Sequence, residues 1–141
     1  MTKIKFPTLT TEQLSRVIAD AVESCPCVEA VGLVGSFARG EQTFRSDVDL
    51  LIKGHGRFSD ILESFGEYVR KILDYQFNKR LDIVKYEFVA ERASRDPVQN
   101  EAWYYREGFA QMLNEVIWLY EKRPADDYEN RRIHQASQPN L

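Results

Sequence analysis

Residues 35–50 read GSFARGEQTFRSDVDL, and this stretch decides the fold because apolar segments precede and follow it. Residues 28–35 are rich in β-branched and small apolar side chains, which predicts a mostly buried strand. Residues 47–53 predict a second strand, which Gly54 and Gly56 end. The sequence therefore predicts two strands joined by a glycine-bounded turn.

Helices and one more strand are expected around this centre. Residues 10–13 match a capping box, and apolar side chains then recur at helical spacing, so we expect an amphipathic helix over 11–24. Ser59 is a candidate cap for a second helix, whose inward face would carry Ile61, Leu62, Phe65, Val69, Ile72 and Leu73. A third strand is expected over 81–86. A last long helix is expected to start at Pro97 and end near Lys122, with one face made of Ala102, Tyr105, Phe109, Met112, Leu113, Val116 and Tyr120.

These elements predict an α/β (α+β) fold, in which a small mixed sheet is flanked by helices and followed by a C-terminal helix. The chain has 141 residues, which is typical of one domain that buries roughly 70% of its unfolded surface. We expect this domain to span residues 10–122. Residues 123–141 mix prolines, charges and amides, which predicts a flexible C-terminal tail.

The composition argues against several classes of protein. No apolar run approaches the ~20 residues of a membrane-spanning helix and no apolar segment follows the N-terminal lysines, so we expect a cytoplasmic protein without a membrane partner. Cys25 and Cys27 are expected to remain reduced thiols, because no second Cys/His pair completes a zinc site. The net charge of -3 argues against direct binding to nucleic acid.

The turn and the second strand carry groups that suit phosphate chemistry. A strand that runs into Gly35 and Ser36 presents backbone N–H groups and a hydroxyl to a phosphate oxygen. Asp47 and Asp49 are two residues apart on a strand, so their side chains leave the same face with about 7 Å between the Cα atoms. Two such carboxylates repel each other unless a divalent cation neutralises them, and hard oxygen ligands suit Mg²⁺.

Asp82 is a third acid, in an otherwise apolar strand. If its strand lies beside that of Asp47 and Asp49 with the same polar face, three carboxylates converge next to a phosphate-binding turn, as two-metal nucleotidyl transfer requires. Each part also has a plainer interpretation. The turn is then only a turn, the acid pair a solvated strand face, and Asp82 a surface ion-pair partner of Lys79, Arg80 or Lys85. The occurrence of all three parts in this order favours the chemical interpretation.

The motif Gly-Ser-Phe-Ala-Arg-Gly, five residues, then Ser-Asp-Val-Asp-Leu resembles, position by position, the G-S-x-A-R-G-x5-S-D-x-D-L signature of the minimal nucleotidyltransferase (MNT) family. This family belongs to the DNA polymerase β-like superfamily, so the resemblance implies a palm-type sheet. It also implies that Gly35 and Ser36 hold the phosphates of ATP, that Asp47 and Asp49 ligate Mg²⁺, and that Asp82 completes a metal site and acts as general base. Arg39 and Ser46 match motif positions as well. Arg39 then contacts the triphosphate or pairs with an acidic neighbour, and Ser46 orients the aspartate strand or contacts a phosphate.

Members of the MNT family commonly act as antitoxins of HEPN-domain ribonuclease toxins by placing AMP on a toxin tyrosine. The resemblance therefore implies an enzyme, a Mg²⁺-dependent protein adenylyltransferase that uses ATP and serves as the antitoxin of a HEPN toxin. A macromolecular acceptor also agrees with the single helix that remains after the third strand. Some aromatic rings of that segment are candidates for a partner surface, namely Trp103, Tyr104, Tyr105, Phe109, Trp118 and Tyr120.

Two alternatives stay open from the sequence. One is a nucleotidyltransferase with a small-molecule acceptor, similar to the aminoglycoside-modifying enzymes. The other is a non-catalytic antitoxin that neutralises its toxin by binding alone. The sequence does not decide between a homo-oligomer and a hetero-oligomer.

Overall fold

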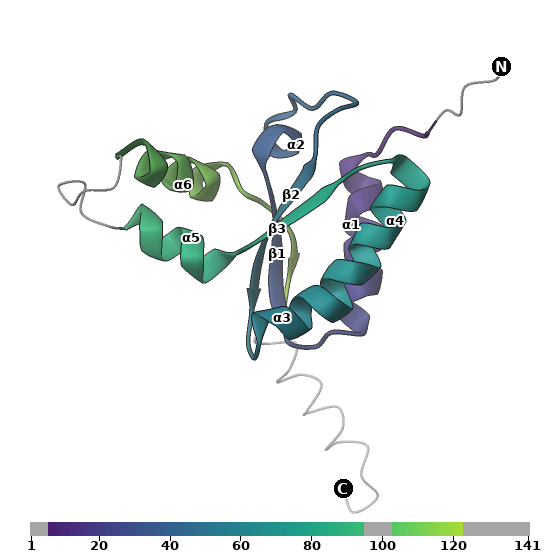
Figure 1. The fold of residues 1–141 in the computed structure, drawn as a ribbon, viewed down its shortest axis with the longest axis horizontal. Helices are drawn as coiled ribbons and strands as arrows, with labels where there is room; N and C mark the ends of the chain where they lie inside the picture. Colours follow the sequence, from purple (N-terminus) through teal and green to yellow (C-terminus); the bar gives the residue numbers. More distant parts are fainter. Residues whose placement is uncertain (1–5, 95–102, 123–141) are drawn as a thin grey trace, which may run out of the picture.

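The computed structural model describes residues 6–94 and 103–122, and its centre is a four-stranded mixed sheet. The strands are β1 (Val28–Val34), β2 (Val48–Gly54), β3 (Leu81–Lys85) and β4 (Ile117–Glu121), and they lie in the order β3-β2-β1-β4. β1 runs antiparallel to both β2 and β4, whereas β2 and β3 are parallel. Helices flank the sheet (Figure 1). The expected α/β class with a mixed sheet is confirmed.

The two faces of the sheet carry separate parts of the core. One face packs against α1 (Thr11–Glu23) and α4 (Glu67–Phe77), and the other against α5 (Tyr86–Ala93) and α6 (Trp103–Glu115) (Figure 1). Leu50 and Ile52 of β2 belong to the larger core cluster on the first face, whereas Leu51 belongs to the smaller cluster on the second. Because side chains alternate along a strand, Asp49 shares the α5–α6 face with Leu51.

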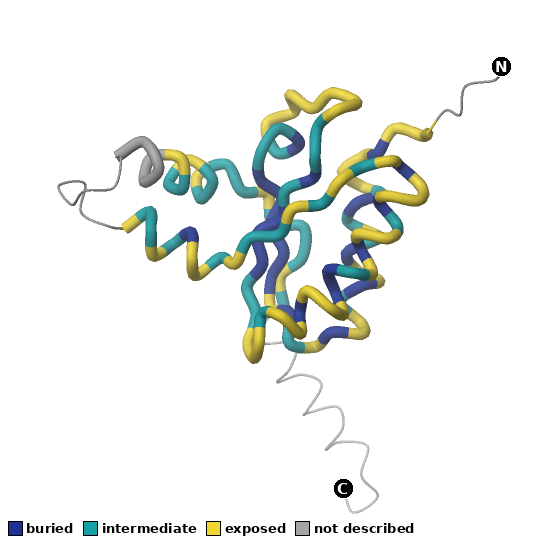
Figure 2. The backbone as a smooth tube through the Cα atoms, in the orientation of Figure 1, coloured by how far each residue is buried: buried dark blue, intermediate teal, exposed yellow. Residues whose placement is uncertain are grey.

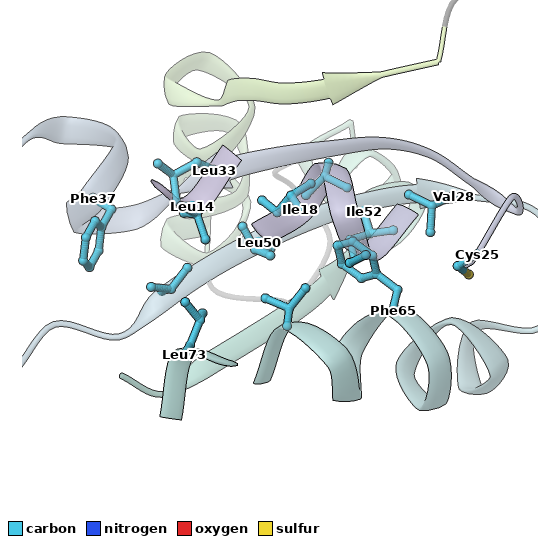
Figure 3. Close-up of a cluster of buried hydrophobic side chains, with 14 of the residues drawn as sticks. Leu14, Ile18, Cys25, Val28, Leu33, Phe37, Leu50, Ile52, Phe65 and Leu73 are labelled. Atoms are coloured by element: carbon cyan, nitrogen blue, oxygen red, sulfur yellow. The ribbon is translucent and has the colours of Figure 1, made fainter. Parts of the chain in front are cut away.

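The larger cluster buries the helices that the sequence predicted on the first face. Leu14 and Ile18 of α1 are fully buried between α4 and the sheet, together with Phe65 and Leu73 (Figure 3). Buried residues are concentrated in the central strands and along the inner sides of these helices (Figure 2). The predicted capping box of α1 is confirmed, since Thr10 Oγ1 accepts a hydrogen bond from the Gln13 N–H and Gln13 Oε1 accepts one from the Thr10 N–H.

The second predicted helix is a continuous helical run with a π-helical turn inside it. It consists of α3 (Phe58–Ile61), the π-helix η1 (Leu62–Gly66) and α4. Ser59 does not cap this run, because α3 begins at Phe58, one residue before Ser59, and its N-cap residue is Arg57. Leu62, which the sequence placed on the inward face, is 38% exposed, because the wider π-helical turn shifts the phase of the buried stripe. Asn78 ends the run in the left-handed conformation, with a φ of 52°.

The sequence-based prediction was wrong after the third strand. β3 ends at Lys85, and Tyr86 begins the unpredicted helix α5. The last helix, α6, ends at Glu115 rather than near Lys122, and residues 117–121 form β4 along β1. This segment is rich in aromatic and β-branched residues, and pairing with a distant strand overrides its helical spacing.

Three further predictions concern residues that the structure does not describe. Pro97 and Ala102 fall outside the described residues, as does the predicted tail over 123–141. None of the helices within 6–94 and 103–122 is long and apolar enough to cross a membrane.

Candidate active site

Asp49 and Asp82 lie directly opposite each other on adjacent parallel strands. The register of β2 and β3 pairs these two residues, so both side chains leave the same face of the sheet. Asp49 is partly buried on a central strand, whereas Asp82 is exposed on the edge strand β3. The prediction that the two acid-bearing strands are neighbours with a common polar face is confirmed.

The three predicted aspartates interact electrostatically. The pKa of Asp49 is raised from 3.8 to about 6, first because burial disfavours the carboxylate, then because Asp82 and Asp47 place negative charge beside it. A hydrogen bond with Asp82 raises this pKa further, and the positive charge of Arg39 lowers it in part. Among the described residues, Asp82 forms no ion pair with Lys79, Arg80 or Lys85, so the plainer interpretation of Asp82 finds no support.

Gly35 brings the backbone of the turn against Asp49. It begins the short helix α2 (Gly35–Arg39) directly after β1, and its φ is +76°. A Cβ atom at this position would clash with Asp49 Oδ2. Glycine is therefore required at this position for two reasons: its backbone adopts the left-handed conformation without strain, and the absence of a side chain allows the close approach to Asp49. The structure thus places Gly35, at the start of the predicted turn, next to Asp49.

Arg39 and Ser46 hold the loop that joins α2 to β2. Arg39 donates from Nε to Glu41 Oε2 at 2.9 Å and from Nη1 to Glu115 Oε2 at 3.2 Å. Of the two roles left open by the sequence, the structure shows the pairing with acidic neighbours. Ser46 Oγ accepts a hydrogen bond from the Thr43 N–H at 2.8 Å, and the Ser46 N–H donates to the Thr43 carbonyl at 3.0 Å. Ser46 therefore closes the turn that leads into the aspartate strand.

The carboxylates fit a magnesium ion that takes part of its coordination from a substrate. Within residues 6–94 and 103–122, no group of three or more Asp, Glu, His or Cys side chains is arranged so that it could hold a metal ion. Mg²⁺, however, is usually held by one or two carboxylates together with substrate phosphates and water. The facing pair Asp49 and Asp82, with Asp47 close enough to raise the pKa of Asp49, supplies such ligands. A cation between them would also offset the repulsion that raises this pKa.

A cavity of about 640 Å³ opens beside Asp47 at the start of β2 and β3. Its lining joins the loop before β2 to the residues that precede β3, and it consists of Phe44, Arg45, Ser46, Asp47, Asp74, Asn78, Lys79 and Arg80. This group of cations was not predicted to be part of the site. The sequence signal for these cations was the consecutive pair Lys79 and Arg80, which directly precedes the strand that carries Asp82.

Two of the aromatic side chains that the sequence offered as a partner surface, Phe109 and Trp118, pack against other rings of the described chain. Trp118 packs on Tyr86 with ring centroids 5.9 Å apart, and the Lys53 ammonium lies 4.1 Å from the centroid of the Tyr86 ring. Phe109 meets the Phe88 ring edge-on, with centroids 5.8 Å apart. The side chains of residues 103–105 lie outside the described part of the chain.

Comparison with known proteins matches the chain to a protein family and to a curated relative. The family model described as "Nucleotidyltransferase domain" matches residues 13–106. A protein of Methanocaldococcus jannaschii, named "Putative protein adenylyltransferase MJ1379", is 44% identical over 50 residues. That match covers 33% of this chain and 49% of the relative, which is about half of its length.

Solved structures with a similar chain path include two toxin–antitoxin complexes. One is a crystal structure of a toxin–antitoxin with AMP-PNP, with a TM-score of 0.49, 17% sequence identity and coverage of 94% of this chain and 92% of the other. The second is a tri-AMPylated HEPN toxin of Shewanella oneidensis in complex with an MNT antitoxin. It has a TM-score of 0.46, 13% identity and coverage of 93% and 92%.

Proposed function

The chain belongs to the nucleotidyltransferase domain family, and from this premise we propose that it transfers AMP from ATP to a tyrosine of a HEPN-domain ribonuclease toxin and thereby acts as an antitoxin. The observation that carries this proposal is the pairing of Asp49 with Asp82 across β2 and β3, beside Asp47 and the Gly35–Ser36 turn. This arrangement matches the acidic cluster that nucleotidyl transfer with divalent metal ions requires.

Two observations support a protein as the acceptor. The curated relative from Methanocaldococcus jannaschii carries the name of a protein adenylyltransferase, and its 44% identity over 50 residues supports the same chemistry here. The cavity of about 640 Å³ beside Asp47 leaves room for a chain segment to approach that carboxylate. The complete MNT signature over residues 35–50 extends the proposal to a HEPN toxin as the partner.

In this proposal Asp47, Asp49 and Asp82 hold Mg²⁺. When bound, the ion lowers the pKa of the attacking hydroxyl and stabilises the negative charge of the triphosphate. Gly35 and Ser36 orient the phosphates through the backbone N–H groups and the Ser36 hydroxyl, next to Asp49.

Asp82 takes the proton of the acceptor. A tyrosine hydroxyl has a pKa near 10, so it needs a base to attack at neutral pH. Asp82 is exposed on the edge strand, where a hydroxyl from another molecule can reach its carboxylate. The tyrosine oxygen bonds to the α-phosphorus, the bond from that phosphorus to the bridging oxygen breaks, and pyrophosphate leaves.

Mass spectrometry of the partner tests this function. The protein is incubated with ATP, Mg²⁺ and a HEPN-domain toxin, and we expect the toxin to gain the mass of AMP on a tyrosine and to lose ribonuclease activity. Asp47→Asn should reduce the transfer at least 100-fold, because an amide is a poor ligand for a hard cation. Asp20→Asn removes an exposed carboxylate from α1 and serves as the matched control.

Two outcomes would refute neutralisation of the toxin by AMP transfer. If the toxin gains no AMP while Asp47→Asn still neutralises it fully, the protein acts by binding alone. If AMP appears instead on a low-molecular-weight compound of a cell lysate without any partner protein, the acceptor is a small molecule.

A further inference from the structure

The cavity beside Asp47 opens where the chain enters the two acid-bearing strands, β2 and β3. It is lined by residues 44–47, which lead into β2, and by residues 78–80, which lead into β3, whereas Gly35 and Ser36 are not part of its lining. Asp47 lines the cavity, and Asp82 follows Arg80 by two residues. A nucleotide held at Gly35 and Ser36 therefore leaves this cavity free for the acceptor.

Two arginines of this cavity have no acidic partner. Among the residues that the structure describes, neither Arg45 nor Arg80 forms an ion pair, although Asp47 and Asp74 line the same cavity. Arg45 instead lies over the ring of Phe44, with its guanidinium carbon 5.3 Å from the ring centroid. Guanidinium groups bind carboxylates through two parallel hydrogen bonds, so two unpaired arginines favour an anionic ligand.

Lys79 fixes the loop that carries these groups. Its ammonium donates to the carbonyl oxygens of Thr43 at 3.1 Å and of Phe44 at 2.8 Å, and it lies 5.6 Å from the centroid of the Phe37 ring. The loop is therefore held in place before any ligand arrives. Such preorganisation reduces the conformational cost of binding.

Phe44 gives the cavity an apolar margin. Its side chain is 83% exposed, although a large aromatic ring is normally buried or used in recognition. It also lines a second hollow of about 340 Å³, whose other walls include Leu9, Phe37 and Phe77. An exposed aromatic ring next to two arginines is the combination of residue types that is enriched at protein interfaces.

We infer that Phe44, Arg45 and Arg80 form the docking site for an acidic segment of the protein acceptor. Carboxylates of that segment pair with the two arginines, and an apolar side chain beside them covers Phe44. This inference rests on the proposed function, because it names the chemistry that brings the acceptor to Asp82. A protein segment fits better than the triphosphate, since an apolar side chain of the segment covers the exposed Phe44 ring, to which a triphosphate offers no apolar group.

Calorimetric titration with a HEPN-domain toxin tests the inference. We expect the double variant Arg45→Gln/Arg80→Gln to raise the dissociation constant for the toxin at least tenfold and to reduce its dependence on salt. Phe44→Ser should raise it by a similar factor. Arg57→Gln removes an exposed cation near the opposite end of β2 and should change neither quantity. Circular dichroism of each variant checks that the fold is kept, which we expect because the three side chains are exposed.

A second titration with a fluorescent ATP analogue and Mg²⁺ separates the acceptor from the nucleotide. We expect the double variant to bind the analogue as tightly as the unaltered protein. If its affinity for the analogue falls as far as its affinity for the toxin, the cavity binds phosphates and the inference is wrong. Unchanged toxin affinity in the double variant, or no binding of the toxin by the unaltered protein, overturns it as well.

The transfer of AMP distinguishes this inference from the proposed function. If the unaltered protein binds the toxin without modifying it, and the double variant binds it more weakly, the docking site stands and the proposed function fails. If the unaltered protein modifies the toxin and the double variant does so with the same KM for the toxin, the proposed function stands and the docking site fails.

Discussion

At the scale of single residues, Asp49 is the most constrained group of the site. It is partly buried on a central strand and is paired with Asp82 in the register of β2 and β3. Its carboxylate also lies close to the backbone of Gly35. Burial and the two neighbouring aspartates all disfavour its negative charge, which is why its pKa rises to about 6. In the metal-free protein this carboxylate therefore opposes folding at neutral pH.

This position predicts a defined dependence of stability on pH. Between the ordinary pKa of 3.8 and the folded value of about 6, the folded state keeps a proton that the unfolded chain releases. The free energy of unfolding should therefore fall as pH rises from about 4 to about 6 and stay lower above that range. Asp49→Asn removes the effect, so in EDTA at pH 7 we expect it to be about 1 kcal/mol more stable than the unaltered protein, a value reduced because solvent screens a half-exposed group.

Urea unfolding at several pH values measures this difference. The gain of Asp49→Asn should shrink as pH falls through the range between the two pKa values and disappear below 3.8, where the carboxyl is protonated in both states. Asp20→Asn, at an exposed position of α1, should show no such trend. A gain for Asp49→Asn that does not change between pH 4 and pH 7 would contradict the assigned electrostatic cause.

The sequence predicted the aspartates better than the cations, and the reason is physical. The acids stand in strands with regular alternation, so their common face follows from the period of the strand. Arg45, Lys79 and Arg80 come from a loop and from the residues between α4 and β3, and only the tertiary fold brings them to one cavity. Arg39 and Ser46 were found by motif position, but their partners depend on the loop conformation.

At the scale of elements, β4 shows where local pattern fails. The apolar spacing of α6 continues into residues 117–121, yet these residues pair with β1 and complete the sheet. A sequence pattern reports the local preference for helix or strand, whereas the edge of β1 with which β4 pairs exists only in the folded sheet. By contrast, α1, β1, β2 and β3 were predicted within one or two residues, because each carries a clear period or cap.

Gly32 offers a test of the packing between β4 and β1. A Cβ atom on this central glycine would clash with Val116 Cγ2 and lie 3.1 Å from the ring of Trp118. Gly32→Ala should therefore lower the free energy of unfolding by about 1 to 3 kcal/mol, since well-packed cores tolerate an added methyl group poorly. Gly108→Ala is the control, because a Cβ atom there meets nothing within 4 Å and alanine favours the helix α6. Chemical denaturation in which Gly32→Ala is as stable as Gly108→Ala would show that β4 does not pack as described.

At the scale of the whole molecule, one face of the sheet carries the larger part of the core and the other face carries the candidate active site. The face covered by α1 and α4 holds the larger core, whereas the α5–α6 face carries Asp49 and Asp82 at its open end. In the proposed function these carboxylates, with Asp47, bind ATP together with a divalent cation. Each part of the proposed function depends on that single property.

Isothermal titration calorimetry of ATP measures this binding. In the presence of Mg²⁺ we predict binding to the unaltered protein and to Asp20→Asn, and at least a tenfold loss of affinity in Asp49→Asn and in Asp82→Asn. The same loss is predicted for the unaltered protein when EDTA replaces Mg²⁺. Equal ATP affinity in all of these titrations, with and without the cation, would show that the aspartates do not bind ATP through a divalent cation.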